Sequence, residues 1–176
     1  MGLATVGMSA ARCAADEPPY NAMGERVGEV TDRSAIVHTR LTAAAERNYK
    51  GYKFPGARHG MNVTDLRKIP MPEGMAVADL EGDCPGKAGR AKLWYGTDSK
   101  LQGARSTAWA SVDGHTDFTH RFVLDDLKPE TTYHYAVELG AAAGKKTRRG
   151  LIGRFRTAPP RDQWRKTNFV VVTCQD

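Results

Sequence analysis

The residues best suited to chemistry lie at the end of the chain, where Cys174 and Asp176 follow an apolar run at residues 169–172. Three of the four residues in this run are valines, which is typical of a strand buried on both faces of a parallel sheet. Ligands of α/β sheets gather beyond the carboxyl ends of the strands. We therefore expect an α/β active site to begin here, with a thiol and a carboxylate at its edge. The alternative is that Cys174 is a buried, inert thiol.

The rest of the chain offers little catalytic material. Cys13 and Cys84 do not form a disulfide framework with Cys174, and Cys84 precedes a Pro-Gly pair that predicts a turn with a free thiol. The chain contains neither a glycine-rich phosphate loop nor a serine nucleophile elbow. No metal-binding spacing links the five histidines, which are His38, His59, His115, His120 and His134. No catalytic site is predicted before the final segment.

The charge and hydropathy of the chain say little about its partners. Lysine and arginine exceed aspartate and glutamate by 26 − 20 = 6, and the excess is spread along the chain. The densest basic cluster, at residues 145–149, has no interleaved aromatic residues, so we interpret it as a solvated hairpin tip and expect no nucleic-acid partner. No apolar run approaches the roughly 20 residues of a membrane-spanning helix, and oligomeric state stays open.

The first 24 residues are ambiguous. Residues 3–11 are mildly apolar and are followed by an Ala-Ala-Asp-Glu-Pro stretch that resembles a cleavage region. No basic segment precedes them, and the apolar part is short for a signal peptide. Both a signal-peptide remnant and a disordered leader remain open for residues 1–24.

The elements that must position the final segment are β-strands. Short alternating or apolar runs bounded by turn residues predict seven of them. They span residues 26–30, 34–41, 91–95, 108–112, 118–124, 132–139 and 153–157. This number is typical of an immunoglobulin or fibronectin type III-like β-sandwich, so we predict an all-β fold.

Several details of the sandwich are also predicted. Residues 127–133, Leu-Lys-Pro-Glu-Thr-Thr-Tyr, indicate a tyrosine corner, in which Tyr133 bonds back to the preceding backbone and Leu127 fills the core. Trp94 is expected to pack between the sheets. Asp113 and Gly114 indicate a hairpin, because this dipeptide accepts positive φ. One or two helical turns are conceivable at residues 43–47.

The domain boundaries follow from these elements. We predict a leader at 1–24, a sandwich domain at 25–158 with an inserted loop at 42–89, a linker at 159–167, and the first strand of a second domain at 168–176. The insertion far exceeds the median connection of about 4–6 residues, so it either covers the sandwich or serves a function. Trp164 is expected to pack back on the sandwich and to set the angle of the linker.

Four segments occur in a particular order: the strand pair at 27–40, the L-K-P-x-T-x-Y corner, the exit strand Gly-Arg-Phe-Arg-Thr-Ala-Pro at 153–159, and Phe-Val-Val-Val-Thr-Cys-Gln at 169–175. In this order they resemble the amino-terminal part of a PhoD-type alkaline phosphatase, a member of the metallophosphoesterase group. The resemblance covers about residues 25–176. The exit strand followed by the apolar run is its most specific part.

The resemblance implies a two-part protein. The sandwich is similar to the amino-terminal domain of such enzymes and of purple acid phosphatases, and the catalytic domain hydrolyses phosphate mono- or diesters. Relatives use iron with calcium, and their iron-ligating cysteine maps onto Cys174, while Asp176 is a weaker match. The other ligands lie on strands that this chain lacks, so the fragment itself is expected to be inactive. Export to the periplasm or the cell exterior is implied by the resemblance alone.

Two other readings stay open. The chain is either a standalone fibronectin-like binding module, with residues 42–89 as its contact surface, or a remnant with a structural role. In the first of these readings the final segment is the last strand of the sandwich itself.

Overall fold

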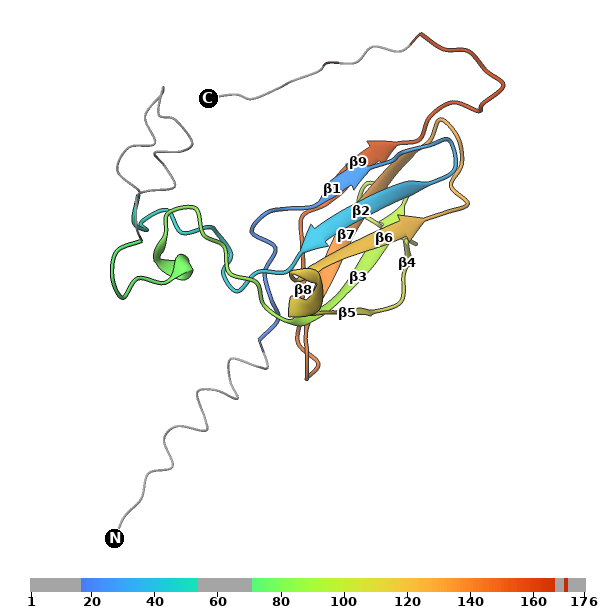
Figure 1. The fold of residues 1–176 in the computed structure, drawn as a ribbon. Helices are drawn as coiled ribbons and strands as arrows, with labels where there is room; N and C mark the ends of the chain where they lie inside the picture. The colour runs from blue at the N-terminus through green and yellow to red at the C-terminus, as the bar shows by residue number, and fades with distance from the viewer. Residues whose placement is uncertain (1–16, 54–70, 167–169, 171–176) are drawn as a thin grey trace.

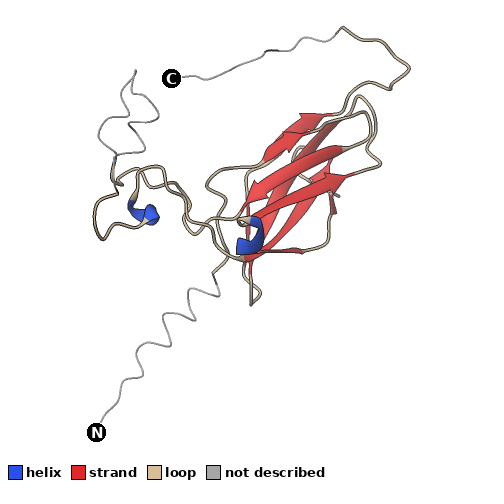
Figure 2. Cartoon of the chain, viewed as in Figure 1, coloured by secondary structure: helices blue, strands red, loops and turns tan. Residues whose placement is uncertain are grey.

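The protein is a sandwich of two antiparallel β-sheets (Figures 1 and 2). The structure, a computed structural model, describes residues 17–53, 71–166 and 170. The smaller sheet has the order β1 (Arg26–Gly28), β2 (Ala35–Arg40), β6 (Thr119–Leu124). The larger sheet is built on β3 (Gly89–Gly96) and β7 (Thr132–Ala141), joined by β4 (Arg105–Ser106), β5 (Ala110–Val112), β8 (Thr147–Arg149) and β9 (Gly153–Arg156). Two short 3-10 helices complete the elements, η1 (Val77–Asp79) and η2 (Gly114–Thr116).

The predicted all-β fold is confirmed, and each of the seven predicted strands has a counterpart. Two further strands, β4 and β8, were missed. Both are short and largely exposed, so neither has the apolar alternation on which strand prediction depends. Strand β4 pairs with the end of β3, while β8 and β9 pair with successive parts of the same edge of β7.

The core lies between the inner faces of the two sheets. In β2 the buried residues are Ala35, Val37 and Thr39, which alternate with partly exposed ones. Residues 132–139 alternate between apolar and polar side chains, and the inner face of β7 follows this alternation, because Tyr133, Tyr135, Val137 and Leu139 are all buried. Burying one valine or leucine side chain stabilises the fold by about 1.5–3 kcal/mol. The alternating buried residues of β2 and β7 therefore stabilise the packing of the two sheets against each other.

The position predicted for Trp94 is wrong. Its neighbour Leu93 is fully buried and occupies the inner face of β3. Because successive strand residues point to opposite faces, Trp94 lies on the outer face of the larger sheet. There its indole Nε1 donates a hydrogen bond of 2.6 Å to Glu138 Oε2.

The hairpin predicted at Asp113 and Gly114 is also wrong. Strand β5 pairs with β3, and β6 pairs with β2, so this segment crosses from one sheet to the other. Asp113 caps η2 by accepting a hydrogen bond from the backbone of His115 at 2.9 Å. The positive φ angles occur later, at Asp117 and Phe118. The dipeptide therefore starts a 3-10 turn, because its carboxylate is used as a cap.

The inserted loop projects from one end of the sandwich, on the left in Figure 1. Within residues 42–53 and 71–89 its two arms are joined by backbone hydrogen bonds, among them Tyr52 N to Asp79 O at 2.8 Å and Glu81 N to Tyr52 O at 3.0 Å. The helical turn considered at 43–47 is absent from the described residues, and η1 lies in the other arm. The boundaries of the insertion stay a prediction.

Arg40 ties the root of this loop to the sandwich. Its Nη1 donates a 2.7 Å hydrogen bond to Cys84 O, and its Nη2 lies 3.1 Å from Asp117 Oδ1. A Cβ atom on Gly86 would lie 1.8 Å from the ring of Phe118, so only glycine fits at this approach. We call residues 40–42, 84–86 and 117–118 the insertion end.

Residues 17–24, predicted as part of the leader, lie against the sandwich. Tyr20 and Thr42 exchange backbone hydrogen bonds of 2.9 and 2.8 Å, Pro19 is fully buried, and the Arg148 guanidinium stacks 3.6 Å from the centre of the Tyr20 ring. The two alternatives for the leader at 1–24 stay predictions, and residues 1–16 of it lie outside the described residues. In the described part of the chain, no helix has the length and apolar character needed to cross a bilayer.

Candidate functional site

The two predicted metal ligands, Cys174 and Asp176, lie outside the described residues. Among the residues that are described, no group of three or more histidine, cysteine or acidic side chains is placed to hold a metal ion. Cys84 is a half-buried free cysteine, as expected from its turn. The sandwich therefore does not supply a metal centre from its described side chains.

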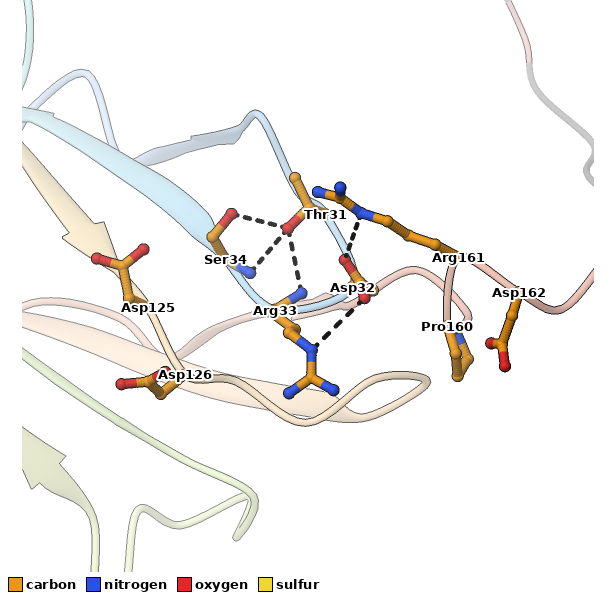
Figure 3. A pocket seen from close by; sticks show the side chains of 9 residues that line it. All are labelled: Thr31, Asp32, Arg33, Ser34, Asp125, Asp126, Pro160, Arg161 and Asp162. Atoms are coloured by element: carbon orange, nitrogen blue, oxygen red, sulfur yellow. Dashed lines mark hydrogen bonds and ion pairs between the residues drawn. The ribbon is translucent and has the colours of Figure 1, made fainter.

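The end of the sandwich where the chain leaves β9 forms an open hollow of about 620 Å³ (Figure 3). Three segments line it: the β1–β2 turn at 31–34, Asp125 and Asp126 after β6, and residues 160–162 of the exit segment. In the figure, Asp125 and Asp126 lie across the hollow from Arg161. We call residues 31–34, 127–131 and 157–162 the exit end.

The β1–β2 turn is held by the hydroxyl of Thr31. This oxygen accepts hydrogen bonds from Arg33 N at 3.1 Å and Ser34 N at 2.9 Å, and lies 2.7 Å from Ser34 Oγ. The backbone of Thr31 also donates to Ser34 O at 2.9 Å. A threonine that bonds the backbone two and three residues onward is typical of a tight turn. The turn thus presents Asp32 in a fixed place.

Asp32 lies between two arginines. Asp32 is 8% exposed. Its carboxylate oxygens lie 3.8 Å from Arg33 Nε and 3.6 Å from Arg161 Nε. Both arginine side chains are mostly exposed, so each pair contributes at most about 1 kcal/mol. The pair with Arg161 matters for the path of the chain, because Arg161 belongs to the exit segment and its contact with Asp32 holds this segment near the β1–β2 turn.

The predicted tyrosine corner is confirmed. The hydroxyl of Tyr133 accepts a hydrogen bond from Lys128 N at 2.9 Å, and Leu127 is 1% exposed. The backbone of Leu127 donates to Arg33 O at 2.9 Å. The corner is therefore joined directly to the β1–β2 turn.

Thr157 anchors the last strand to this corner. Its hydroxyl accepts a hydrogen bond from Thr131 N at 2.9 Å and donates one to Lys128 O at 2.6 Å. Ala158 N then donates to Thr31 O at 3.0 Å. Thr157 is 2% exposed, and hydrogen bonds of buried groups cost free energy when a partner is lost. The chain is thus pinned to the sandwich as far as residue 158.

Beyond residue 158 the contacts are exposed. Arg161 pairs with Asp32, and Arg165 Nε lies 3.3 Å from Glu130 Oε1. Trp164 is 99% exposed, so the prediction that it packs on the sandwich is wrong. Its neighbours Gln163 and Arg165 are polar, and Arg165 is engaged with Glu130.

The contacts of the exit end hold the last strand and the exit segment against the sandwich. Carboxylates, guanidinium groups and hydroxyls line its hollow, with no histidine or cysteine among the lining residues. Sequence reasoning found the corner but missed Asp32, Thr157 and Arg161. The available signal was the Thr-x-x-Ser spacing at 31–34, which predicts a hydroxyl-stabilised turn.

A family model described as "PhoD-like phosphatase, N-terminal domain" matches residues 8–159. Among solved structures, the chain is similar to PhoD, with 16% identity and a TM-score of 0.48 over 81% of this chain and 20% of that one. It is also similar to the sensor domain of the anti-sigma factor RsgI4 of Pseudobacteroides cellulosolvens, with 16% identity and a TM-score of 0.42 over 82% and 95% of the two chains.

A fibronectin type III domain derived from the human KIAA0970 protein gives 12% identity and a TM-score of 0.48, over 99% of this chain and 100% of that one. No curated protein sequence matches the chain. The chain corresponds to only about a fifth of the length of the PhoD structure, because 20% of that structure is covered.

Proposed function

Because the chain belongs to the family of PhoD-like phosphatase N-terminal domains, we propose that it is the sandwich module of a metal-dependent phosphatase. The family match over residues 8–159 carries this proposal, since it spans every strand from β1 to β9. In the complete protein, a following catalytic domain hydrolyses phosphate mono- or diesters. The sandwich itself takes no part in bond breaking.

The role of the sandwich in this proposal is to fix where the catalytic domain begins. Thr157 and Ala158 are hydrogen-bonded to the corner and to the β1–β2 turn. Arg161 continues the contact through Asp32. A chain held at three successive points leaves the sandwich in a defined direction, and this restricts the orientations open to whatever follows it.

The proposed metal ligands are Cys174 and Asp176. A thiolate and a carboxylate suit iron, and carboxylate oxygens also suit calcium. Two residues cannot complete such a centre, so the other ligands must come from later strands of the catalytic domain. The 176-residue chain alone is therefore expected to be inactive. Export to the periplasm or the cell exterior is proposed on the resemblance alone, and recovery of the protein only from the cytoplasm after cell fractionation would contradict it.

The test compares the 176-residue chain with the product of the whole gene, both supplied with iron and calcium. Hydrolysis of an aryl phosphate is expected from the whole product and not from the 176-residue chain. Cys174→Ser in the whole product should lower kcat at least a hundredfold. Cys84→Ser removes another free thiol, 90 positions earlier in the sequence than Cys174, and should leave kcat unchanged.

Each outcome decides a different part of the proposal. Full activity of the Cys174→Ser variant would remove the metal assignment but not the family role of the sandwich. A gene product with no phosphatase activity would favour the standalone binding module instead. Turnover by the 176-residue chain would show that the missing ligands are not required.

A further inference from the structure

The outer face of the larger sheet carries a row of stacked aromatic and cationic side chains. Lys92 on β3 lies opposite Glu138 on β7, and Glu138 lies opposite Arg149 on β8. Residues opposite each other in a ladder share one face of the sheet. Leu93 and Leu139 point into the core, so their neighbours Lys92 and Glu138 point outward.

The rings of Trp94 and Trp109 contact three cations of this face. The Lys92 ammonium lies 4.5 Å from the centre of the Trp94 ring and 4.7 Å from that of Trp109. The guanidinium of Arg149 lies 5.0 Å from Trp94, and that of Arg90 lies 4.7 Å from Trp109. Such contacts contribute about 0.5–2 kcal/mol each. They also fix the positions of the cations, so a ligand that binds them loses less side-chain entropy.

Glu138 compensates only Lys92. Its Oε2 lies 3.2 Å from the Lys92 ammonium, and both side chains are 16% exposed. Burial raises the pKa of Glu138, but hydrogen bonds from Trp94, Thr147 and Lys92 outweigh it and hold this pKa below its ordinary value. The carboxylate is therefore ionised at neutral pH, and its negative charge is neutralised by the ammonium group of Lys92.

The arginines of this face have no such compensation. Arg154 and Arg156 on β9 lie opposite His134 and Thr132 on the same outward register, and both are exposed. Within the described residues, neither they nor Arg149 form an ion pair. We call Arg90, Arg149, Arg154 and Arg156 the arginine face.

The spacing of the arginine face follows from the strands. Residues two apart on one face of a strand are separated by about 6.6 Å, which is the expected step from Arg154 to Arg156. Arg149 lies opposite Glu138 and Arg154 lies opposite His134. Because these two residues of β7 are four positions apart, Arg149 lies two such steps beyond Arg154 along the same edge of β7. The three arginines thus mark a line along one edge of the sheet, with Arg90 on β3 across from it.

We propose that the arginine face binds a linear polyphosphate chain. Guanidinium groups match phosphate oxygens through paired hydrogen bonds, and a flexible chain of phosphates can follow a line of arginines. The tryptophan rings already carry cations, so they offer little free surface for stacking bases. This distinguishes the ligand from single-stranded nucleic acid, which depends on such stacking. The site is separate from the exit end and does not depend on the proposed hydrolysis.

The test measures binding of inorganic polyphosphate to the 176-residue chain by titration calorimetry. Arg154→Gln with Arg156→Gln removes two exposed positive charges from the arginine face. The matched control, Arg26→Gln with Arg121→Gln, removes two exposed charges from the outer face of the smaller sheet. The first double variant should weaken binding at least tenfold, and the control should change it less than twofold.

Salt and competitor give the remaining readouts. For three or four phosphate contacts, log affinity against log salt should fall with a slope of about −2 to −3. Absence of binding at low salt would overturn the proposal, as would equal losses in the two double variants, which would indicate a response to net charge only. Tighter binding of oligothymidylate than of polyphosphate at equal phosphate concentration would overturn it in favour of nucleic acid.

Discussion

The two ends of the sandwich are closed in different ways. At the exit end, the contacts join residues of one corner to the last strand through buried hydroxyls, as in Tyr133 with Lys128 and Thr157 with Thr131. At the insertion end, Arg40 reaches Cys84 and Asp117, which are 44 and 77 positions away in the sequence. The exit end combines a local motif at residues 127–133 with long-range contacts to the β1–β2 turn, whereas the insertion end depends on long-range contacts around one arginine and one glycine. A local motif leaves a trace in the sequence, and a long-range contact does not.

The largest expected effect breaks the exit end. Leu127→Ala removes a side chain that is 1% exposed and leaves a cavity beneath the corner. It should lower the free energy of unfolding by about 3 kcal/mol, measured by urea denaturation. Leu151→Ala is the matched control, because Leu151 is 87% exposed. If the two variants were equally stable, the corner would not be closing the core.

The next effect breaks the insertion end. Gly86→Ala places a Cβ 1.8 Å from the ring of Phe118, and that ring packs against the core. Overpacking of this kind should cost about 2 kcal/mol. Gly28→Ala is the control, since nothing lies within 4 Å of its Cβ position. An unchanged thermal midpoint for Gly86→Ala would show that the Phe118 ring moves aside without lowering the free energy of unfolding.

A smaller effect tests the hydroxyl that anchors the last strand. Thr157→Val keeps the shape of the side chain but leaves Thr131 N and Lys128 O without their buried partner. The expected loss is about 1.5 kcal/mol. Amide exchange should also accelerate at residues 131 and 158. Thr119→Val, where the bonded hydroxyl is exposed, should cost less than about 0.5 kcal/mol.

The smallest effect has the opposite sign and concerns Glu25, which lies just before β1. Burial raises the pKa of Glu25 above its ordinary value of 4.5, although a hydrogen bond from Asn21 opposes this. The folded state therefore favours the protonated carboxyl, so its contribution to stability is full in acid and is lost as the pH rises through the folded-state pKa. Glu25→Gln should raise the thermal midpoint at pH 7 by about 1–2 °C.

The pH dependence separates this cause from others. The advantage of Glu25→Gln should shrink as the pH falls toward 4.5 and disappear well below it, where Glu25 is protonated in both states. Glu73→Gln replaces an exposed glutamate and is the control for the loss of one negative charge. An advantage that persists unchanged in acid would assign the effect to packing rather than to ionisation.

The sequence predicted the parts of the fold that depend on local order. The alternation at residues 132–139 matches the inner face of β7, and the Leu-Lys-Pro motif located the corner. Trp94 was predicted in the core because it is large and aromatic. Its neighbour Leu93 is buried, and successive residues of a strand point to opposite faces, so Trp94 lies on the outer face. The predicted hairpin at Asp113 failed because a capping carboxylate competes with a turn. Asp32 and Arg161 could not be paired in advance, since more than a hundred residues separate them in the sequence.

The divided edge of the larger sheet has a consequence for association between molecules. Strands β8 and β9 share one side of β7, with residues 150–152 between them. Neither is longer than four residues, and exposed arginines lie along both. A short, interrupted and positively charged border is a poor template for another molecule's strand. This border is therefore expected to resist the addition of strands from other molecules, which is the first step of fibril-like association.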